Sequence, residues 1–209
     1  MSIKLGVLSM IVSLFVGLPM GALMARYKYR WFDKLGTLFI VCIQAVPAAV
    51  YFLYIQLYGT QALGVGLLFQ IDDPKYWILP VVSMSLNNIA FYGMWLRRYM
   101  VDESNKDYVK LARLAGAGHL RIMFVHILPN TISVLVPAVM IGFNNAVLAE
   151  AGMSYLGIGV QPPDASLGRM LSEAQTYIFS APGFALFPGI FIVVMVLGFS
   201  LLAEGLKRD

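Results

Sequence analysis

Residues 184–206 read FALFPGIFIVVMVLGFSLLAEGL, an apolar stretch whose one charged side chain is Glu204. A bilayer core about 30 Å thick is crossed by roughly 20 apolar residues in a helix, so this stretch is long enough to span a membrane. Four further stretches have the same character: Leu5–Ala25, Leu35–Gly59, Trp77–Leu96 and Thr131–Ala151. Because backbone groups in lipid must pair within their own segment, we expect five transmembrane helices.

The composition of the whole chain also indicates a membrane protein. Of its 209 residues, 59% are hydrophobic and 12% are charged, and the mean hydropathy of +0.76 exceeds that of soluble domains. The net charge of +4 comes from basic residues between the apolar stretches, so membrane topology explains it better than nucleic-acid binding. We expect one all-α transmembrane bundle over residues 1–209. The only cysteine, Cys42, excludes an internal disulfide and a thiolate metal cluster.

Lysine and arginine are concentrated in alternate loops, which predicts the orientation in the membrane. Three segments hold twelve of the fifteen basic residues: Arg26, Lys28, Arg30 and Lys34; Arg97, Arg98, Lys106, Lys110, Arg113 and Arg121; Lys207 and Arg208. Loops rich in these residues stay in the cytoplasm. We therefore predict a multi-pass protein of the cytoplasmic (inner) membrane with a cytoplasmic C-terminus. Five spans then place the N-terminus outside, although the chain begins almost directly at its first span, so we expect that a first helix is missing.

The long basic loop, residues 97–127, contains a segment that predicts a short amphipathic helix. An apolar stripe follows helical spacing and a basic stripe is expected on the opposite face. The apolar stripe consists of Tyr108, Leu111, Ala112 and Ala115, and the basic stripe of Lys106, Lys110 and Arg113. Gly116 is predicted to end the helix in the left-handed conformation. Such a helix lies on a membrane surface or docks in a groove of a soluble partner, and the pattern alone leaves both open.

The segment after this helix predicts how the next span begins. Residues 120–127 form a second short amphipathic stretch, which leads directly into Leu128, Pro129 and Asn130. Proline is well tolerated in the first turn of a helix, where its missing N–H has no partner to lose.

The loop resembles the EAA loop of binding-protein-dependent ABC importers, specifically the dipeptide, oligopeptide and nickel permeases. In that family the loop forms a coupling helix that sits in a cleft of the ATPase subunit. The resemblance implies that the ATPase-coupling residues are Asp107, Tyr108, Lys110, Leu111, Ala112, Arg113, Ala115, Gly116 and Ala117. The family's Glu-Ala-Ala triplet is here Lys110, Leu111 and Ala112, so an ion pair made by that glutamate is not implied.

A second segment, residues 149–163 followed by Ser166, Leu167 and Gly168, is similar to the motif of the second permease subunit in this family. Leu167 stands where the family usually has tryptophan. Members of the family normally begin with a cytoplasmic tail, a first span and an extracellular segment, which give six spans.

The resemblance implies a type I ABC importer permease and a set of partners. These partners are a second homologous permease, two ATPase subunits, an extracellular substrate-binding protein and membrane lipid. The chain has no glycine-rich phosphate loop, so we expect it to bind no cofactor itself, with ATP and Mg on the partner subunits. The expected cargo is peptide. The alternative is nickel or a metal chelate, which the same family carries.

Polar residues inside the predicted spans are candidates for a translocation path. Amides are costly in lipid unless they face a partner helix or a wet cavity, so they could line a path or join helices. The amides are Asn87, Asn88, Asn144 and Asn145. Glu150 lies near the outer end of its span, where we favour a polar anchor for the turn at residues 157–163 over a substrate ligand. Few other buried acids are expected, which disfavours an ion-coupled carrier. No metal site is expected, because His119 and His126 have no third ligand nearby.

Overall fold

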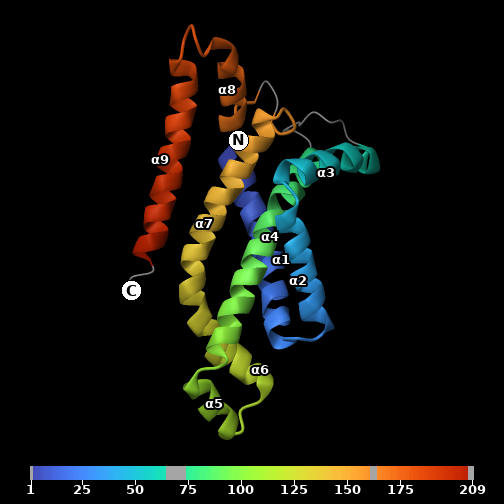
Figure 1. Cartoon of the computed structure of the whole chain (residues 1–209), viewed down its shortest axis with the longest axis vertical. Helices are drawn as coiled ribbons and strands as arrows, with labels where there is room; N and C mark the ends of the chain where they lie inside the picture. The colour runs from blue at the N-terminus through green and yellow to red at the C-terminus, as the bar shows by residue number, and fades with distance from the viewer. Residues whose placement is uncertain (1, 65–73, 161–163, 207–209) are drawn as a thin grey trace.

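The computed structural model describes residues 2–64, 74–160 and 164–206, and within these ranges the secondary structure is helical, with no strand. Three long helices form the centre of the bundle: α1 (Ser2–Arg26), α4 (Lys75–Glu103) and α7 (Leu128–Tyr155) (Figure 1). Each pair among these three is in contact, and α1 packs most extensively on α4. The all-α bundle expected from the sequence is confirmed.

Glycines allow α1 and α4 to approach closely. A Cβ atom added to Gly21 would lie 2.6 Å from the carbonyl oxygen of Gly93, and one added to Gly17 would lie 3.0 Å from that of Ile89. Both neighbours are backbone atoms and cannot rotate away. The spacing of four residues places the two glycines on one face of α1, as expected for a small-xxx-small contact between membrane helices.

The predicted second span, Leu35–Gly59, is wrong as a single helix. The chain forms α2 (Trp31–Ala45) and α3 (Ala48–Leu63), which are bent by 99° at the break between them. Val46 is extended there, with φ −90° and ψ 129°. Proline has no N–H to donate and disfavours helical conformation in the residue before it, so Pro47 accounts for the break.

The number of membrane spans depends on how this bent pair and α4 are counted. By length and apolar composition, three helical segments of the described chain can cross a membrane, namely residues 2–26, 134–155 and 183–205, and the bent pair can supply a fourth. Helix α4 contains the predicted span Trp77–Leu96 but is not among these segments. It is long, and it buries polar residues such as Ser83 and Asn88 among its neighbours. The five predicted spans therefore remain a prediction.

The first turn of α2 is fixed to α4 by an ion pair. Arg97 donates from Nε and Nη2 to the two carboxylate oxygens of Asp33, at 2.5 and 2.7 Å. The backbone N–H of Tyr29 donates to the same carboxylate at 2.9 Å, and Tyr29 itself has a positive φ of 66°. Arg97, counted above as a loop residue, thus lies in α4 and joins two segments 64 residues apart.

The shorter elements occupy the two ends of the bundle (Figure 1). One end carries α5 (Asp107–Leu114), α6 (His119–Arg121) and the π-helical turn η1 (Ile122–Ile127). The other carries α8 (Leu167–Ala174) and the 3-10 turn η2 (Gln175–Tyr177), after which α9 (Gly183–Gly205) runs back beside α7.

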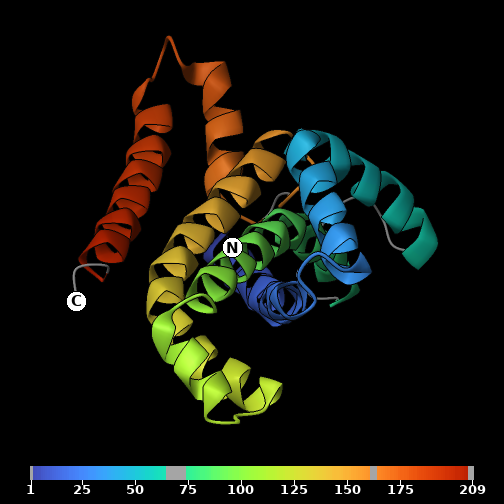
Figure 2. The same cartoon turned by 60° about the horizontal axis from the view of Figure 1, so that its bottom comes forward.

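The basic α1–α2 turn and the basic loop after α4 lie at the same end of the bundle (Figures 1 and 2). This is the arrangement that the alternate-loop pattern requires. Lys207 and Arg208, the third basic segment, lie outside the described residues, as does the Gln161–Pro163 part of the second motif.

Candidate functional site

Helix α5 ends at Gly116 in a glycine-dependent cap. Gly116 has a φ of 81°, its N–H donates to the Arg113 carbonyl at 3.0 Å, and the Ala117 N–H donates to the Ala112 carbonyl at 3.0 Å. These two bonds define a Schellman motif, in which the left-handed residue satisfies carbonyls that the helix end leaves free. The left-handed stop predicted at Gly116 is confirmed.

The apolar stripe predicted on α5 is divided between two faces. Val109 is fully buried in a cluster with Met100, Ile122 and other apolar residues, and Tyr108 and Ala112 pack against it. Leu111 and Ala115, in contrast, are exposed, together with Leu114, which is 85% exposed. The predicted apolar stripe therefore differs from the buried face of α5, because it omitted the buried Val109 and included the exposed Leu111 and Ala115. Helix α5 is thus held to the bundle on one side and presents leucines on another.

The predicted basic stripe of α5 is also divided. Lys106 pairs with Glu103 at 2.7 Å, and Lys110 pairs with Asp107 at 2.8 Å. Arg113 forms no ion pair with an acid among the described residues and lines a pocket instead. The three residues therefore do not form one free basic face.

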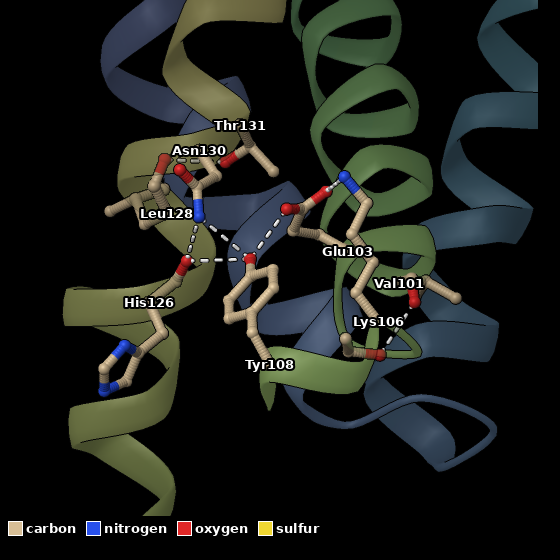
Figure 3. A network of polar contacts seen from close by, with 9 residues as sticks. Val101, Glu103, Lys106, Tyr108, His126, Leu128, Asn130 and Thr131 are labelled. Carbon is tan, nitrogen blue, oxygen red and sulfur yellow. Dashed lines mark hydrogen bonds and ion pairs between the residues drawn. The ribbon is translucent and has the colours of Figure 1, made fainter. Parts of the chain in front are cut away.

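Tyr108 connects α5 to both long helices that flank the loop (Figure 3). Its hydroxyl donates to Glu103 Oε1 at 2.6 Å, at the end of α4, and lies 3.1 Å from the His126 carbonyl oxygen. Asn130 Nδ2, in the first turn of α7, donates to the Tyr108 oxygen at 2.9 Å and to the same carbonyl at 2.8 Å. A displacement of α5 would therefore strain contacts with α4 and α7 together.

The chain enters α7 through a π-helical turn that contains His126. Pro129 has no N–H for the carbonyl four residues before it, and the chain adopts wider bonding, such as Leu128 N–H to the Met123 carbonyl. Pro129 lies at the start of α7, as expected. The side chain of Asn130 donates to the His126 carbonyl in this irregular turn.

Glu103 is a buried carboxylate that this network keeps ionised. Burial raises its pKa, but the hydrogen bonds from Lys106 and Tyr108 and the charge of Lys106 outweigh burial, so the pKa lies below its ordinary value of 4.5. The Tyr108 hydroxyl has a raised pKa, because of burial and because it donates to Glu103. A carboxylate with a lowered pKa stabilises the fold above its ordinary pKa and loses that contribution as the pH falls through the lowered value.

The lowered pKa of Glu103 leads to a pH-dependent prediction for the stability of Tyr108→Phe. At pH 6–7 the variant should be less stable by about 1–2 kcal/mol, since it lacks a hydrogen bond to a charged group. As the pH falls below 4.5 and through the lowered pKa of Glu103, the difference should shrink, because the carboxylate that accepts the Tyr108 hydrogen bond becomes protonated. Thermal unfolding of both proteins from pH 3 to pH 7 measures this. The exposed Tyr177, at the other end, gives the control Tyr177→Phe. A pH-independent loss in Tyr108→Phe would contradict the role given to Glu103.

The four amides proposed for a translocation path are in different environments. Asn88 is buried and its Nδ2 donates to the Gly142 carbonyl at 3.1 Å, which joins α4 to α7. Asn144 is buried and donates to the Val196 carbonyl and Ser200 Oγ at 3.1 and 3.2 Å, which joins α7 to α9. Asn87 is exposed and Asn145 is half-buried. Asn88 and Asn144 thus make the interhelical contacts named above as the alternative, and the path itself stays a prediction.

Glu150 anchors the turn that follows α7. It is 1% exposed, and its Oε1 accepts from Ser154 Oγ at 2.6 Å. Ser154 Oγ in turn accepts from the Val160 N–H at 3.0 Å. Gly157 closes the helix at φ 80°, and its cap matches that of Gly116, with the Ile158 N–H donating to the Met153 carbonyl. This geometry is that of the predicted polar anchor for residues 157–160.

Removing the central hydroxyl, in Ser154→Ala, should destabilise the protein. The buried Val160 N–H and the Glu150 carboxyl would both lose a partner, and each buried polar group left unpaired costs about 1–3 kcal/mol. Thermal unfolding in detergent measures the loss. Ser180→Ala is the matched control, because Ser180 is exposed at the same end and donates only to the Tyr177 carbonyl. Equal effects of the two changes would contradict the anchor.

Three residues of the site were not among the predicted coupling residues: Glu103, Val109 and Asn130. Glu103 and Lys106 have the spacing of a helical ion pair, and Asn130 directly follows the proline that begins α7. Those signals were present in the sequence, but they do not show that the Tyr108 hydroxyl lies between Glu103 and Asn130. Only the packing of α4 against α7 brings them together.

Comparison with known proteins now defines the class of this bundle and loop. The family described as "Binding-protein-dependent transport system inner membrane component" matches residues 17–208. The chain belongs to this family, whose members are the membrane permease components of ABC importers and not their ATPases.

Individual relatives are peptide permeases. The chain is 33% identical over 207 residues to the di/tripeptide transport system permease protein of Pseudomonas aeruginosa, covering 99% of this chain and 63% of that protein. It is 40% identical over 126 residues to the dipeptide transport system permease protein of Haemophilus influenzae, covering 60% of this chain and 43% of that protein. The chain therefore spans less than two thirds of the length of these relatives.

Solved structures agree on the fold. An inward-facing structure of the MetNI methionine ABC transporter superposes with a TM-score of 0.75 at 15% identity, covering 99% of this chain and 91% of that one. At this identity the likeness concerns the fold alone, and it confirms the ABC importer type of bundle.

Proposed function

We propose that this chain is the membrane-spanning permease subunit of an ATP-driven importer that translocates peptides. The observation that carries the proposal is α5, a capped helix held to both α4 and α7 by Tyr108, with leucines exposed on it. This is the geometry needed to pass movement from an ATPase subunit to the helices of the bundle. ATP and Mg would bind on the ATPase subunits, while this chain binds no cofactor.

The proposed assembly contains a second homologous permease, two ATPase subunits and an extracellular substrate-binding protein. The basic end of the bundle, with α5, faces the cytoplasm in this proposal, because basic loops remain on that side. Helix α9 is then expected to end towards the cytoplasmic side, in keeping with the cytoplasmic C-terminus predicted from the sequence. The opposite end, with α8, faces the binding protein.

Peptide is the cargo that the relatives favour. Those reported above are named for dipeptides or for di- and tripeptides, and neither name mentions nickel. Within the described residues, no group of three His, Cys, Asp or Glu side chains is placed to hold a metal ion.

Two measurements test the proposal. In a Cys42→Ser background, a cysteine at Ser180 should react with an impermeant thiol reagent added outside intact cells, and one at Asn105 should react only after permeabilisation. Both positions are exposed, at opposite ends of the bundle. Deletion of the gene should abolish uptake of labelled dipeptide and leave nickel uptake unchanged. Reversed labelling would refute the orientation, and loss of nickel uptake alone would refute the cargo.

A further inference from the structure

A small pocket at the basic end of the bundle brings together basic side chains from two separate segments. Its volume is about 200 Å³, and Arg26 and Lys28 line it from the α1 end and the turn after it. Arg113 and His119 line it from the loop around Gly116, and Ser104 adds a hydroxyl from the end of α4. Lys28 and Arg113, which are 85 positions apart in sequence, therefore line one cavity.

Three acids at this end of the bundle are paired with other basic residues. Asp33 is paired with Arg97, Glu103 with Lys106, and Asp107 with Lys110. None of the described residues that line the pocket is acidic. Arg26 and Lys28 instead lie over aromatic rings, 5.3 Å from the Tyr27 centroid and 4.9 Å from the Tyr29 centroid. Among the described residues, no ion pair joins Arg26, Lys28 or Arg113 to an acid, so a negatively charged ligand fits these three cations.

The remainder of the pocket wall is apolar, and its position is that of a membrane interface. Met100, Ile122 and Ile127 belong to the buried cluster beneath α5 and form part of the lining. Arg26 is the last residue of a helix that is long and apolar enough to span a membrane. Exposed Tyr29 and Trp31 lie beside it, as aromatic residues do at the level of lipid headgroups.

We propose that this pocket binds the headgroup of an anionic phospholipid, with the phosphate between Arg26, Lys28 and Arg113 and the glycerol region against the apolar wall. Basic pockets between membrane helices on the cytoplasmic side bind such headgroups. Since Arg26 and Lys28 belong to the bundle and Arg113 to α5, the lipid would tie the coupling loop to α1. The inference rests on the proposed orientation, but it concerns a ligand that the proposed transport function does not require.

The test measures lipid binding by the purified full chain, without its partners. Native mass spectrometry and thermal unfolding are carried out in mixed micelles that contain phosphatidylglycerol or, for comparison, phosphatidylcholine. We expect phosphatidylglycerol alone to be retained and to raise the melting temperature. Each cation near a lipid phosphate contributes roughly a fivefold gain in affinity, so Arg26→Gln combined with Lys28→Gln should weaken phosphatidylglycerol binding about 25-fold.

The matched control is Arg30→Gln combined with Lys34→Gln, which removes two charges from the same turn. Both residues are exposed and neither lines the pocket. This control should bind phosphatidylglycerol as the unaltered chain does. An equal loss in the control would show a diffuse surface effect and overturn the site. Equal stabilisation by inorganic phosphate would assign the pocket to a free anion and overturn the lipid.

The outcomes separate this inference from the proposed function. Normal lipid preference together with reversed thiol labelling would refute the orientation and leave the pocket as a headgroup site. Conversely, no lipid preference, together with loss of ATPase co-purification in the double variant, would overturn the inference in favour of an acidic segment of a protein partner. The proposed transport function would stand in that case, because it is tested separately by dipeptide uptake of the unaltered protein.

Discussion

Gly116→Val is expected to abolish substrate-stimulated ATP hydrolysis and peptide uptake while leaving the permease in the membrane. Gly116 has a φ of 81°, where an L side chain costs roughly 1–2 kcal/mol, and more for a β-branched residue. The strain arises from the backbone alone, because no atom lies within 4 Å of a Cβ placed there. Relief requires breaking the bonds from Gly116 and Ala117 to the end of α5.

The loss of this cap would change the position of the surface that α5 presents. Ala117 packs against the buried cluster beneath α5, so a longer or tilted helix would move it away from that cluster. The exposed leucines Leu111 and Leu114 would then meet the ATPase in a different register. Hydrolysis measured in the assembled transporter should fall to its unstimulated rate, and co-purification of the ATPase separates uncoupling from dissociation.

Gly118→Val is the control for this experiment. Gly118 has equally open space around it, but its φ of −67° and ψ of 153° suit any residue. It should retain coupling within a factor of about two, as expected for a surface change without a specific structural cost. If Gly118→Val is as damaging as Gly116→Val, crowding in the loop would explain the result in place of the left-handed cap.

Gly21→Leu is expected to prevent the permease from accumulating in the membrane. Even a single Cβ atom at Gly21 would lie 2.6 Å from the Gly93 carbonyl oxygen and 3.1 Å from its Cα, so α1 and α4 would have to separate. Gly21→Ala should therefore already cost about 1–3 kcal/mol, in the range of overpacked cores, and leucine more. Membrane abundance, detergent extraction and thermal unfolding measure these effects.

Gly198→Leu in α9 is the matched control for this second change. It also introduces leucine into a membrane helix, but no atom lies within 4 Å of a Cβ at Gly198, and α9 is largely uncovered in this chain. The control should accumulate and unfold like the unaltered protein. If Gly21→Leu did the same, the close contact between α1 and α4 would not exist in the membrane.

Local features of the sequence predicted the parts of this structure that depend on local chemistry. The apolar run of α9, the stop at Gly116 and the start of α7 at Pro129 each follow from a few adjacent residues. The break at Pro47 was also readable, since proline and the residue before it both oppose a helix, but composition favoured one continuous span.

Features that depend on packing were not predictable in the same way. Arg97 was counted as a loop charge, although it pairs with Asp33, because nothing in the sequence places residues 64 positions apart in contact. The face of α5 was offset for a related reason: Val109 and Leu111 are both apolar, and only the neighbouring helices decide which of them is buried. The fold class could be predicted from the length and apolar composition of the spans, whereas the site depends on contacts between helices.

The central claim is that the exposed face of α5 touches an ATPase subunit, and photocrosslinking at Leu114 tests it most directly. Leu114 is 85% exposed, so a photoreactive amino acid there should leave the fold intact. In cells that produce the whole transporter, irradiation should crosslink this chain to an ATPase subunit and give a product with the summed mass of the two subunits. The same photoreactive amino acid at Phe179, which is fully exposed at the opposite end of the bundle, should give no such product. No ATPase adduct at Leu114, or an equal yield at Phe179, would contradict the account.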